Sequence, residues 1–451
     1  MTILRAIPRL LTLAGPVVLA EIGWMSMGLV DTVMVGPLGP EAIGAVGMGS
    51  SLFMALGIFG LGLLLGLDTL VSQAFGAGRL DECRGWLRHG VALALLLSVP
   101  LMTLAWGGVS LLPSIGLNPT VMPLLIPYLR IIVLSTLPLL LYAAFRRYLQ
   151  GIGLVKPVMV ALLSANVVNA VGNWVLVYGH AGMPPLGSTG SAWATTIARV
   201  YMAGFLFVAI QAYHRRTGQA HAPRAPIVAA RLAELLRLGF PAASQVTLEV
   251  GVFAACTALA GRLPAVELAS HQIALNVASL AFMVPLGLSS AGAVTVGQAV
   301  GRGDPAGAEH AGWAALALGV GFMAIAALGF VLAPHALIGV FSRDPGVLVI
   351  GTRLLIVAAV FQLFDGMQGV ATGLLRGLGD TRTPMITNFV GHWLFGLPIA
   401  YVTCFVLGWG VVGLWVGLSA GLIAVSLVLL RAWVHEVHGL RSSTQHPAPS
   451  T

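Results

Sequence analysis

The sequence predicts an all-α membrane protein with twelve transmembrane helices in two pseudo-symmetric six-helix bundles around a central cavity. First, 58% of its 451 residues are hydrophobic and only 8% are charged, against about 25% charged residues in soluble domains. Second, apolar stretches of membrane-spanning length recur along the whole chain. Third, the two halves of the chain resemble each other at an offset of about 225 residues. Most of this chain is therefore expected to lie in the hydrocarbon core of a membrane.

Each predicted span is a mostly apolar stretch, because about 20 such residues are needed to cross the hydrocarbon core as a helix. The twelve expected helices cover residues 11–35, 42–69, 88–112, 124–146, 158–179, 189–213, 236–262, 268–298, 312–340, 347–372, 384–408 and 410–433.

Charged residues test this count and orient the chain. Alternate predicted loops and both termini together carry 18 of the 23 Lys and Arg residues, whereas the opposite loops at 36–41, 113–123 and 180–188 carry none. Under the positive-inside rule, both termini face the cytoplasm. The net charge of +8 follows from this topology, so no nucleic-acid partner is expected. We expect a monomer in contact with bilayer lipid.

The polar segments divide the chain. We expect an N-terminal six-helix lobe over residues 1–213, a cytoplasmic linker over 214–235 and a C-terminal six-helix lobe over 236–438. The polar tail at 439–451 is predicted to be disordered.

An internal repeat indicates how the halves are related. SQAFGAG at 72–78 matches GQAVGRG at 297–303, and YLQGIGLVKPVM at 148–159 matches LLRGLGDTRTPM at 374–385. Six spans per half give both halves the same orientation, and transporters are often built from such parallel repeats. The chain has no Walker loop, so ATP does not power it directly. The three cysteines show no metal-binding spacing, and a catalytic cluster is not evident, so we expect no enzyme.

A few acids lie inside the predicted spans, where a charge is costly. An acid that faces a cavity can exchange a proton or a sodium ion, and the alternative is a structural hydrogen bond to a neighbouring helix. For Glu21 and Asp68 the structural alternative carries more weight, since Asp68 lies near the end of its predicted span. The acids are Glu21, Asp31, Asp68, Glu249 and Asp365.

Other polar residues in the spans have two interpretations each. Asn169 and Asn173 are four residues apart and share a helix face, so they either hydrogen-bond a carboxylate of the first helix or bridge helices structurally. His271 is either a packing residue with its hydrogen bonds satisfied or a proton relay.

Several blocks resemble the multidrug and toxic compound extrusion (MATE) transporters. These are VDTVMVGPLGPEAIGAVG, LDTLVSQAFGAG, LEVGVFAACTALAGRLPAVELASHQIALN and LLRGLGDTRTPM, and they keep the family's order over nearly the whole chain. EVGVF with Glu249 and FQLFDGMQ with Asp365 are similar to the NorM-like subgroup. The resemblance implies antiport of small organic cations and drugs against H⁺ or Na⁺ across a bacterial inner (plasma) membrane, with no other cofactor.

The resemblance also implies roles for individual residues. Asp31 resembles the first-helix acid of the N-terminal lobe, Asn169 and Asn173 resemble the pair that supports it, and Thr195 resembles the nearby threonine. Glu249 and Asp365 resemble the acids of the C-terminal lobe, where Na⁺ is the possible metal ion.

The chain departs from the family in two places. Some relatives carry an acid where Asn173 stands, and since an amide cannot release a proton, Asp31 alone would exchange protons in that lobe. Asp68 lies in an LDTL block more like eukaryotic members, which leaves its place among the supporting polar residues open.

Two other functions remain alternatives. A lipid or lipid-linked-sugar flippase of the same superfamily would carry basic residues inside its cavity, and Arg199 is the only clear arginine within a span. A membrane-embedded lipid enzyme is the alternative from another class. The sequence does not choose the substrate, the coupling ion or the lobe that binds drug.

Overall fold

The computed structural model describes residues 3–115, 119–218 and 226–445, and the regular structure in these ranges is entirely helical. Twelve candidate spans in them are long and apolar enough to cross a membrane. The predicted all-α fold and the predicted number of spans are therefore confirmed.

Residue contacts divide the chain into two compact units. The N-terminal unit comprises Leu19–Phe75 and Arg79–Ala243, and the C-terminal unit comprises Met1–Val18, Gly76–Gly78 and Ser244–Thr451. The boundaries at residues 18 and 243 fall inside two long helices, whereas lobes at 1–213 and 236–438 were expected. The physical reason is that Leu10 and Ala14, at the start of the first helix, pack into the core of the C-terminal unit.

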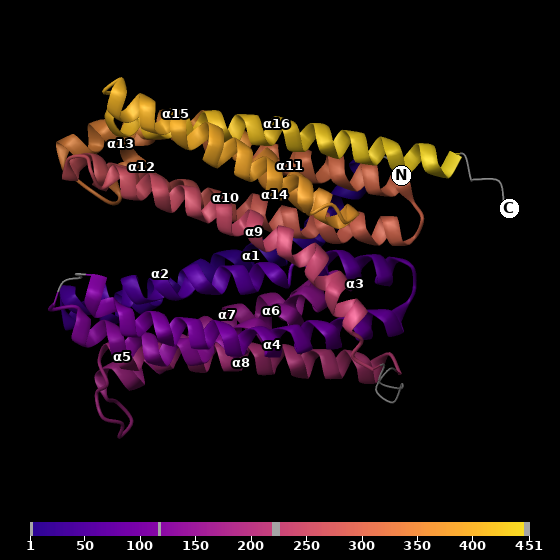
Figure 1. Cartoon of the computed structure of the whole chain (residues 1–451), viewed down its shortest axis with the longest axis horizontal. Coiled ribbons are helices and arrows are strands. Elements are labelled where there is room, and N and C mark those ends of the chain that lie inside the picture. The colour runs from indigo at the N-terminus through magenta and orange to yellow at the C-terminus, as the bar shows by residue number, and fades with distance from the viewer. Residues whose placement is uncertain (1–2, 116–118, 219–225, 446–451) are drawn as a thin grey trace. The chain divides into compact units, whose positions relative to one another are not determined.

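The helices that begin in the first half of the chain are mostly long and parallel or antiparallel to their neighbours within the N-terminal unit (Figure 1). They are α1 (Ile3–Val35), α2 (Pro40–Leu63), α3 (Gly66–Gly76), α4 (Leu80–Leu111), α5 (Met122–Ile132), α6 (Thr136–Gly151), α7 (Val155–Tyr178) and α8 (Ser188–Arg216), with short 3₁₀ segments η1 (Gly36–Leu38), η2 (Leu112–Ile115) and η3 (Val133–Ser135).

In the second half of the chain, α13 packs against α10, α11 and α16 (Figure 1). The helices are α9 (Ala229–Ala260), α10 (Ala265–Gly301), α11 (Pro305–Leu332), α12 (Pro334–Gly339), α13 (Pro345–Leu378), α14 (Arg382–Asn388), α15 (Leu397–Tyr401) and α16 (Gly410–Gln445), with π-helical segments η5 (Phe389–Gly396) and η6 (Val402–Val406).

Several predicted boundaries differ from the structure. The stretch expected as one helix at 312–340 is broken, because α11 ends at Leu332 and Pro334 begins α12. Helices occupy 214–216 and 229–235 of the expected linker, while 219–225 lie outside the described residues. The expected disordered tail is helical from 439 to 445, since α16 continues to Gln445, and 446–451 lie outside the described residues.

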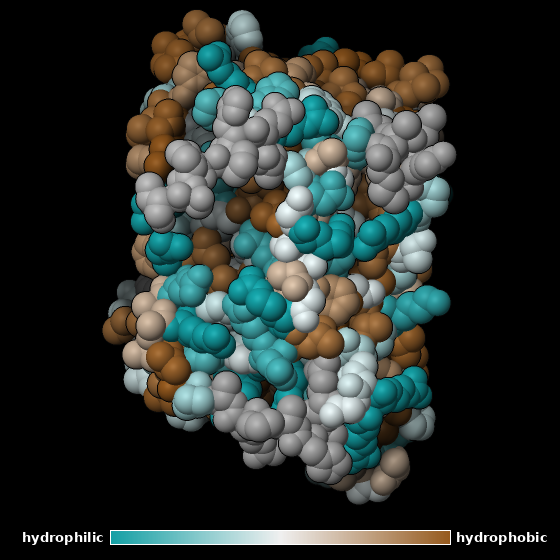
Figure 2. Space-filling view, turned by 90° about the vertical axis from the view of Figure 1, so that its right-hand side faces the viewer, coloured by the Kyte–Doolittle hydropathy of each residue, from teal (hydrophilic) through white to brown (hydrophobic). Residues whose placement is uncertain are grey.

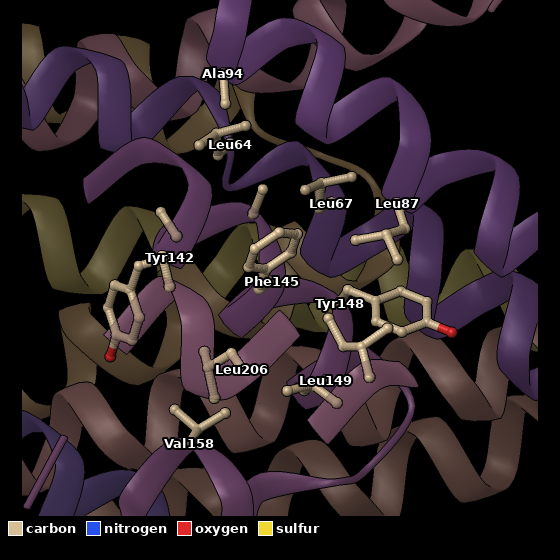
Figure 3. Close-up of a cluster of buried hydrophobic side chains, with 14 of the residues drawn as sticks. Leu64, Leu67, Leu87, Ala94, Tyr142, Phe145, Tyr148, Leu149, Val158 and Leu206 are labelled. Atoms are coloured by element: carbon tan, nitrogen blue, oxygen red, sulfur yellow. The ribbon is translucent and has the colours of Figure 1, made fainter. Parts of the chain in front are cut away.

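The core of the N-terminal unit is assembled from several helices (Figure 3). Leu64, Leu67 and Leu149 are fully buried in it, and the Tyr142 ring stacks on Trp24 of α1 with the ring centroids 6.2 Å apart. Apolar side chains also lie on the surface, among them Val167 at 63% exposure. Apolar side chains exposed along membrane-spanning helices can face lipid.

Hydrophilic side chains gather instead at helix ends. Figure 2 shows the end at which the C-terminal end of α16 lies, and teal residues cover much of this face. Polar groups at helix ends and apolar groups along helix sides are the distribution expected of a membrane-spanning chain.

The internal repeat is visible in matched turns. After α3 the amide of Arg79 donates to the carbonyl of Ala74, and after α10 the amide of Asp304 donates to the carbonyl of Ala299, both at 3.0 Å. Gly78 and Gly303 precede these amides with φ of 73° and 67°, a left-handed conformation that costs other residues about 1–2 kcal/mol. The repeated glycines are therefore required by the same helix-ending turn.

Candidate functional site

A carboxylate in the N-terminal unit is held by three neutral side chains. Asp31 of α1 accepts hydrogen bonds at Oδ1 from the Nδ2 atoms of Asn169 (3.0 Å) and Asn173 (2.8 Å) of α7. Its Oδ2 accepts from the Thr195 hydroxyl of α8 at 2.7 Å. All four side chains are buried, so the structure brings together the residues that the resemblance predicted for this lobe.

The helix seam between α1 and α7 fixes the position of Asp31. On the N-terminal side of Asp31 in α1, the carbonyl of Gly23 accepts a hydrogen bond from Asn166 Nδ2 of α7 at 2.9 Å. On the other side, Tyr178 Oη donates to the carbonyl of Met34 at 2.5 Å. The three contacts advance in the same direction along both helices, which therefore run parallel. Hydrogen bonds on both sides of Asp31 therefore fix α1 against α7, and this holds the carboxylate in place.

Arg199 lies one helical turn after Thr195, but its side chain contacts Ser135 and Phe53 and not Asp31. Its Nη1 donates to the Ser135 hydroxyl at 2.5 Å, and its guanidinium lies 4.6 Å from the centroid of the Phe53 ring. No ion pair joins Asp31 to a basic side chain among the described residues. Its direct partners are neutral, and Arg199 acts on it only at a distance.

The C-terminal unit contains the two other predicted acids. Glu249 of α9 accepts a hydrogen bond from the Gln245 amide one turn earlier. Asp365 of α13 is only 6% exposed. Its carboxyl group interacts electrostatically with that of Glu249. Across the described part of the chain, no hydrogen bond or ion pair reaches the Asp365 carboxylate. Two neighbouring carboxylates repel unless a proton or another cation binds.

Sequence reasoning missed a second polar group in the C-terminal unit. Gln368, one turn after Asp365, donates through Nε2 to Asn388 Oδ1 at 3.4 Å, and its Oε1 lies 3.3 Å from His392 Nε2. One turn before Asp365, the Gln362 amide is fully buried, and neither of its polar atoms has a partner among the described residues. The signal was present in the FQLFDGMQ segment, which places a glutamine on either side of the acid.

Glu21 and Asp68 have arginine partners, unlike the three acids above. Glu21 forms a buried ion pair with Arg146, and Asp68 is bonded to Arg147 with 3.3 Å between Nη1 and Oδ2. The predicted span ended at residue 146, but α6 continues to Gly151 and therefore contains both arginines. Asp68 also lies in the first turn of α3, eight residues before that helix ends.

His271 is held between two side chains of the C-terminal unit. Trp415 Nε1 donates to its Nδ1 at 3.0 Å, and its Nε2 lies 3.0 Å from the Thr257 hydroxyl. Because an indole nitrogen only donates, Nδ1 must be the unprotonated acceptor. This geometry favours the packing interpretation over a proton relay.

No group of three or more His, Cys, Asp or Glu side chains that could hold a metal ion is present in the described ranges. A sodium ion is a different case, because it binds oxygen ligands that include amide and backbone carbonyls. The carboxylates of Glu249 and Asp365 and the unpartnered Gln362 carbonyl are oxygen donors of this kind.

Comparison with known proteins agrees with this architecture. The chain is 37% identical over 436 residues to "Probable multidrug resistance protein NorM" of Mesorhizobium japonicum, covering 94% of this chain and 92% of the relative. It is 37% identical over 430 residues to "Multidrug resistance protein NorM" of Burkholderia vietnamiensis, covering 93% and 92%.

A solved structure of the eukaryotic MATE transporter AtDTX14 has the same fold. Its TM-score is 0.88 at 22% identity, covering 98% of this chain and 99% of that chain. The model of the MatE family matches residues 16–175 and 241–402. The chain therefore belongs to the MatE family, as the sequence motifs predicted.

Proposed function

We propose that this chain is a secondary active multidrug efflux transporter that exports hydrophobic organic cations in exchange for H⁺ or Na⁺. The multidrug resistance proteins to which it is similar support this function. In the proposed cycle the two lobes give access to either side of the membrane in turn. The chain lies in a bacterial inner membrane as a monomer, with both termini in the cytoplasm.

One observation carries the proposal: Asp31 is buried within a spanning helix and bound only by neutral donors. Asp31 has no basic side chain in contact among the described residues, whereas Glu21 and Asp68 are each paired with an arginine. Amide and hydroxyl donors stabilise the anion less strongly than a cation does. A proton or a cationic substrate can therefore bind Asp31 reversibly.

We infer from the hydrogen bonds of Asp31 that Oδ2 takes the proton. Oδ1 already accepts from two amide groups, and an amide donor cannot become an acceptor through the same atom. Oδ2 accepts only from the Thr195 hydroxyl, which can rotate to accept a hydrogen bond instead. Protonation at Oδ2 removes the negative charge that attracts a cationic drug. Asn173 releases no proton, so Asp31 exchanges protons alone in this lobe.

In the C-terminal lobe, Glu249 and Asp365 supply the second cation site. A proton shared by the pair, or one sodium ion bound to both, relieves the repulsion between the carboxylates. The Gln362 carbonyl is a further oxygen that a sodium ion would satisfy. Cation binding on the outside then favours repacking of α9 and α13 and release of the drug.

Ethidium efflux from inverted membrane vesicles tests this function. Asp365→Asn keeps the shape of the side chain but removes its charge, so cation-coupled efflux should be lost while expression is retained. Asp344→Asn is the matched control, because Asp344 is exposed and caps the N-terminus of the same helix at Val347. Asparagine is an equally good cap. Unchanged efflux in the Asp365 variant would contradict its assignment.

A further inference from the structure

We propose that a groove on the N-terminal unit binds one anionic phospholipid, with the phosphate on Arg84 and Arg88 and an acyl chain along α4 and α8. The groove has a volume of about 390 Å³, and all its lining residues except Ile227 lie on α4, α6 and α8. Its walls are mainly apolar and include Leu87, Phe145 and Phe207. Leu87 and Phe145 also belong to the core cluster in Figure 3.

The polar end of the groove is basic. Arg84 and Arg88 are four residues apart on α4, so they lie on one face of the helix. The Nη1 atom of Arg88 is buried and has no hydrogen-bond partner among the described residues. Arg84 forms an ion pair with Asp81 at 3.7 Å, and because the Asp81 side chain is 90% exposed, this pair is weak. An unsatisfied guanidinium N–H is costly, and a phosphate oxygen is a strong acceptor for it.

The apolar end suits an acyl chain. Leu87, Val91 and Leu95 follow one another at four-residue spacing along α4. Phe145 and Phe207 line the groove with their ring centroids 6.0 Å apart. Leu95 and Phe207 are each 49% exposed, so the groove opens onto the apolar surface of the unit. A free phosphate would leave this apolar wall unused, and the two arginines disfavour a cationic drug.

The depth of the arginines in the membrane also fits a lipid. α4 has 32 residues, which is roughly 48 Å at 1.5 Å per residue, whereas the hydrocarbon core is only about 30 Å thick. Arg84 and Arg88 lie within the first nine residues of α4, so they reach the headgroup layer while Leu95 reaches the acyl chains. Basic pockets between helices at this level are typical binding sites for anionic lipid headgroups.

Native mass spectrometry of the full-length protein tests the proposal by titration with phosphatidylglycerol or phosphatidylcholine of identical chains. The wild-type protein should bind one phosphatidylglycerol about tenfold more tightly than phosphatidylcholine. Arg84→Gln/Arg88→Gln should remove this preference. Arg215→Gln/Arg216→Gln is the matched control, since it deletes the same charge from exposed positions at the end of α8, and it should keep the preference.

Three results would overturn the proposal. The first is equal binding of both lipids by the wild-type protein. This test needs no variant, so it remains valid even if the double variant fails to fold. The control could lose the preference as fully as the groove variant, which would indicate general surface charge. Glycerol 3-phosphate could displace the lipid at equal concentration, which would indicate a site for a free anion. Phosphatidylglycerol bound through Arg88 should resist such displacement, because its acyl chain occupies the groove.

Discussion

At the scale of single residues, the hydroxyl of Thr195 is the one donor to Asp31 that can reverse its role when the carboxylate is protonated. Removing the hydroxyl deletes a hydrogen bond to a charged group, which is worth about 1.5–3 kcal/mol. We therefore expect Thr195→Ala to reduce gradient-driven efflux by about tenfold or more, and Thr195→Ser to restore most of it. Initial rates of ethidium efflux at matched protein amounts measure the effect.

Thr196 supplies the control for this prediction. It is buried next to Thr195 on α8, but its hydroxyl donates to the carbonyl of Ala192 in its own helix. Thr196→Ala should leave the efflux rate close to that of the wild-type protein. Equal losses in the Thr195 and Thr196 variants would show that the hydroxyl on Asp31 has no special part in coupling.

The indole of Trp415 gives a second prediction, which concerns stability. Trp415→Phe leaves Nδ1 of buried His271 without its donor, and an unsatisfied buried polar atom costs about 1–3 kcal/mol. The variant should unfold at a lower temperature in detergent, yet the cation that drives efflux should stay the same. A change in coupling ion with no change in thermal stability would point to a relay through His271.

Some contacts of the Asp31 site could be predicted from the sequence, and others could not. The four-residue spacing of Asn169 and Asn173 placed both amides on one face, and the family motif supplied their partner. The spacing could not show that Asn166 fixes the same seam through the Gly23 carbonyl, because a side chain that bonds to backbone leaves no pattern in its partner's sequence. Gln362 and Gln368 were missed for a similar reason, since amides in apolar helices have many possible partners.

At the scale of helices, the ion pair between Glu21 and Arg146 connects α1 to α6 inside the N-terminal unit. Removing one partner leaves a buried charge alone and costs about 3–5 kcal/mol, whereas replacing both by apolar residues is often neutral. Arg146→Met should therefore lower the thermal stability strongly, and Glu21→Met/Arg146→Met should recover much of it. The measurement is a double-mutant cycle of unfolding temperatures.

The same cycle distinguishes a structural pair from a transport site. A double variant that is stable and still exports drug would fit the structural role. A double variant that is stable but inactive would place Glu21 among the acids that exchange cations, against the present assignment. The charge count could not foresee this pair, because it treats every arginine near a predicted helix end as a loop residue.

The matched turns after α3 and α10 give a prediction about backbone strain. Gly78 and Gly303 both have positive φ, and a Cβ atom at either position would meet no neighbouring atom within 4 Å. Gly78→Ala and Gly303→Ala should each destabilise the protein by about 1–2 kcal/mol through conformation alone. Asparagine, which tolerates this conformation better, should cost less at both sites. Unequal effects at the two turns would contradict their equivalence, and thermal unfolding measures them.

At the scale of the whole chain, hydropathy and charge were sufficient to predict twelve spans and an all-α fold, because a membrane imposes one length and one polarity on every span. The division into units was harder to predict. The start of α1 packs with the C-terminal unit, and residues of α9 up to Ala243 pack with the N-terminal unit. Hydropathy finds where a helix crosses the membrane but not which core each half of that helix joins.

The central claim is that buried carboxylates without basic partners couple cation movement to drug export. The most direct measurement is drug transport in proteoliposomes with an H⁺ or a Na⁺ gradient imposed separately, for the wild-type protein and Asp31→Asn at equal reconstituted amounts. The account predicts that at least one gradient drives transport by the wild-type protein and that Asp31→Asn loses this response. Gradient-driven transport by Asp31→Asn at the wild-type rate would contradict it.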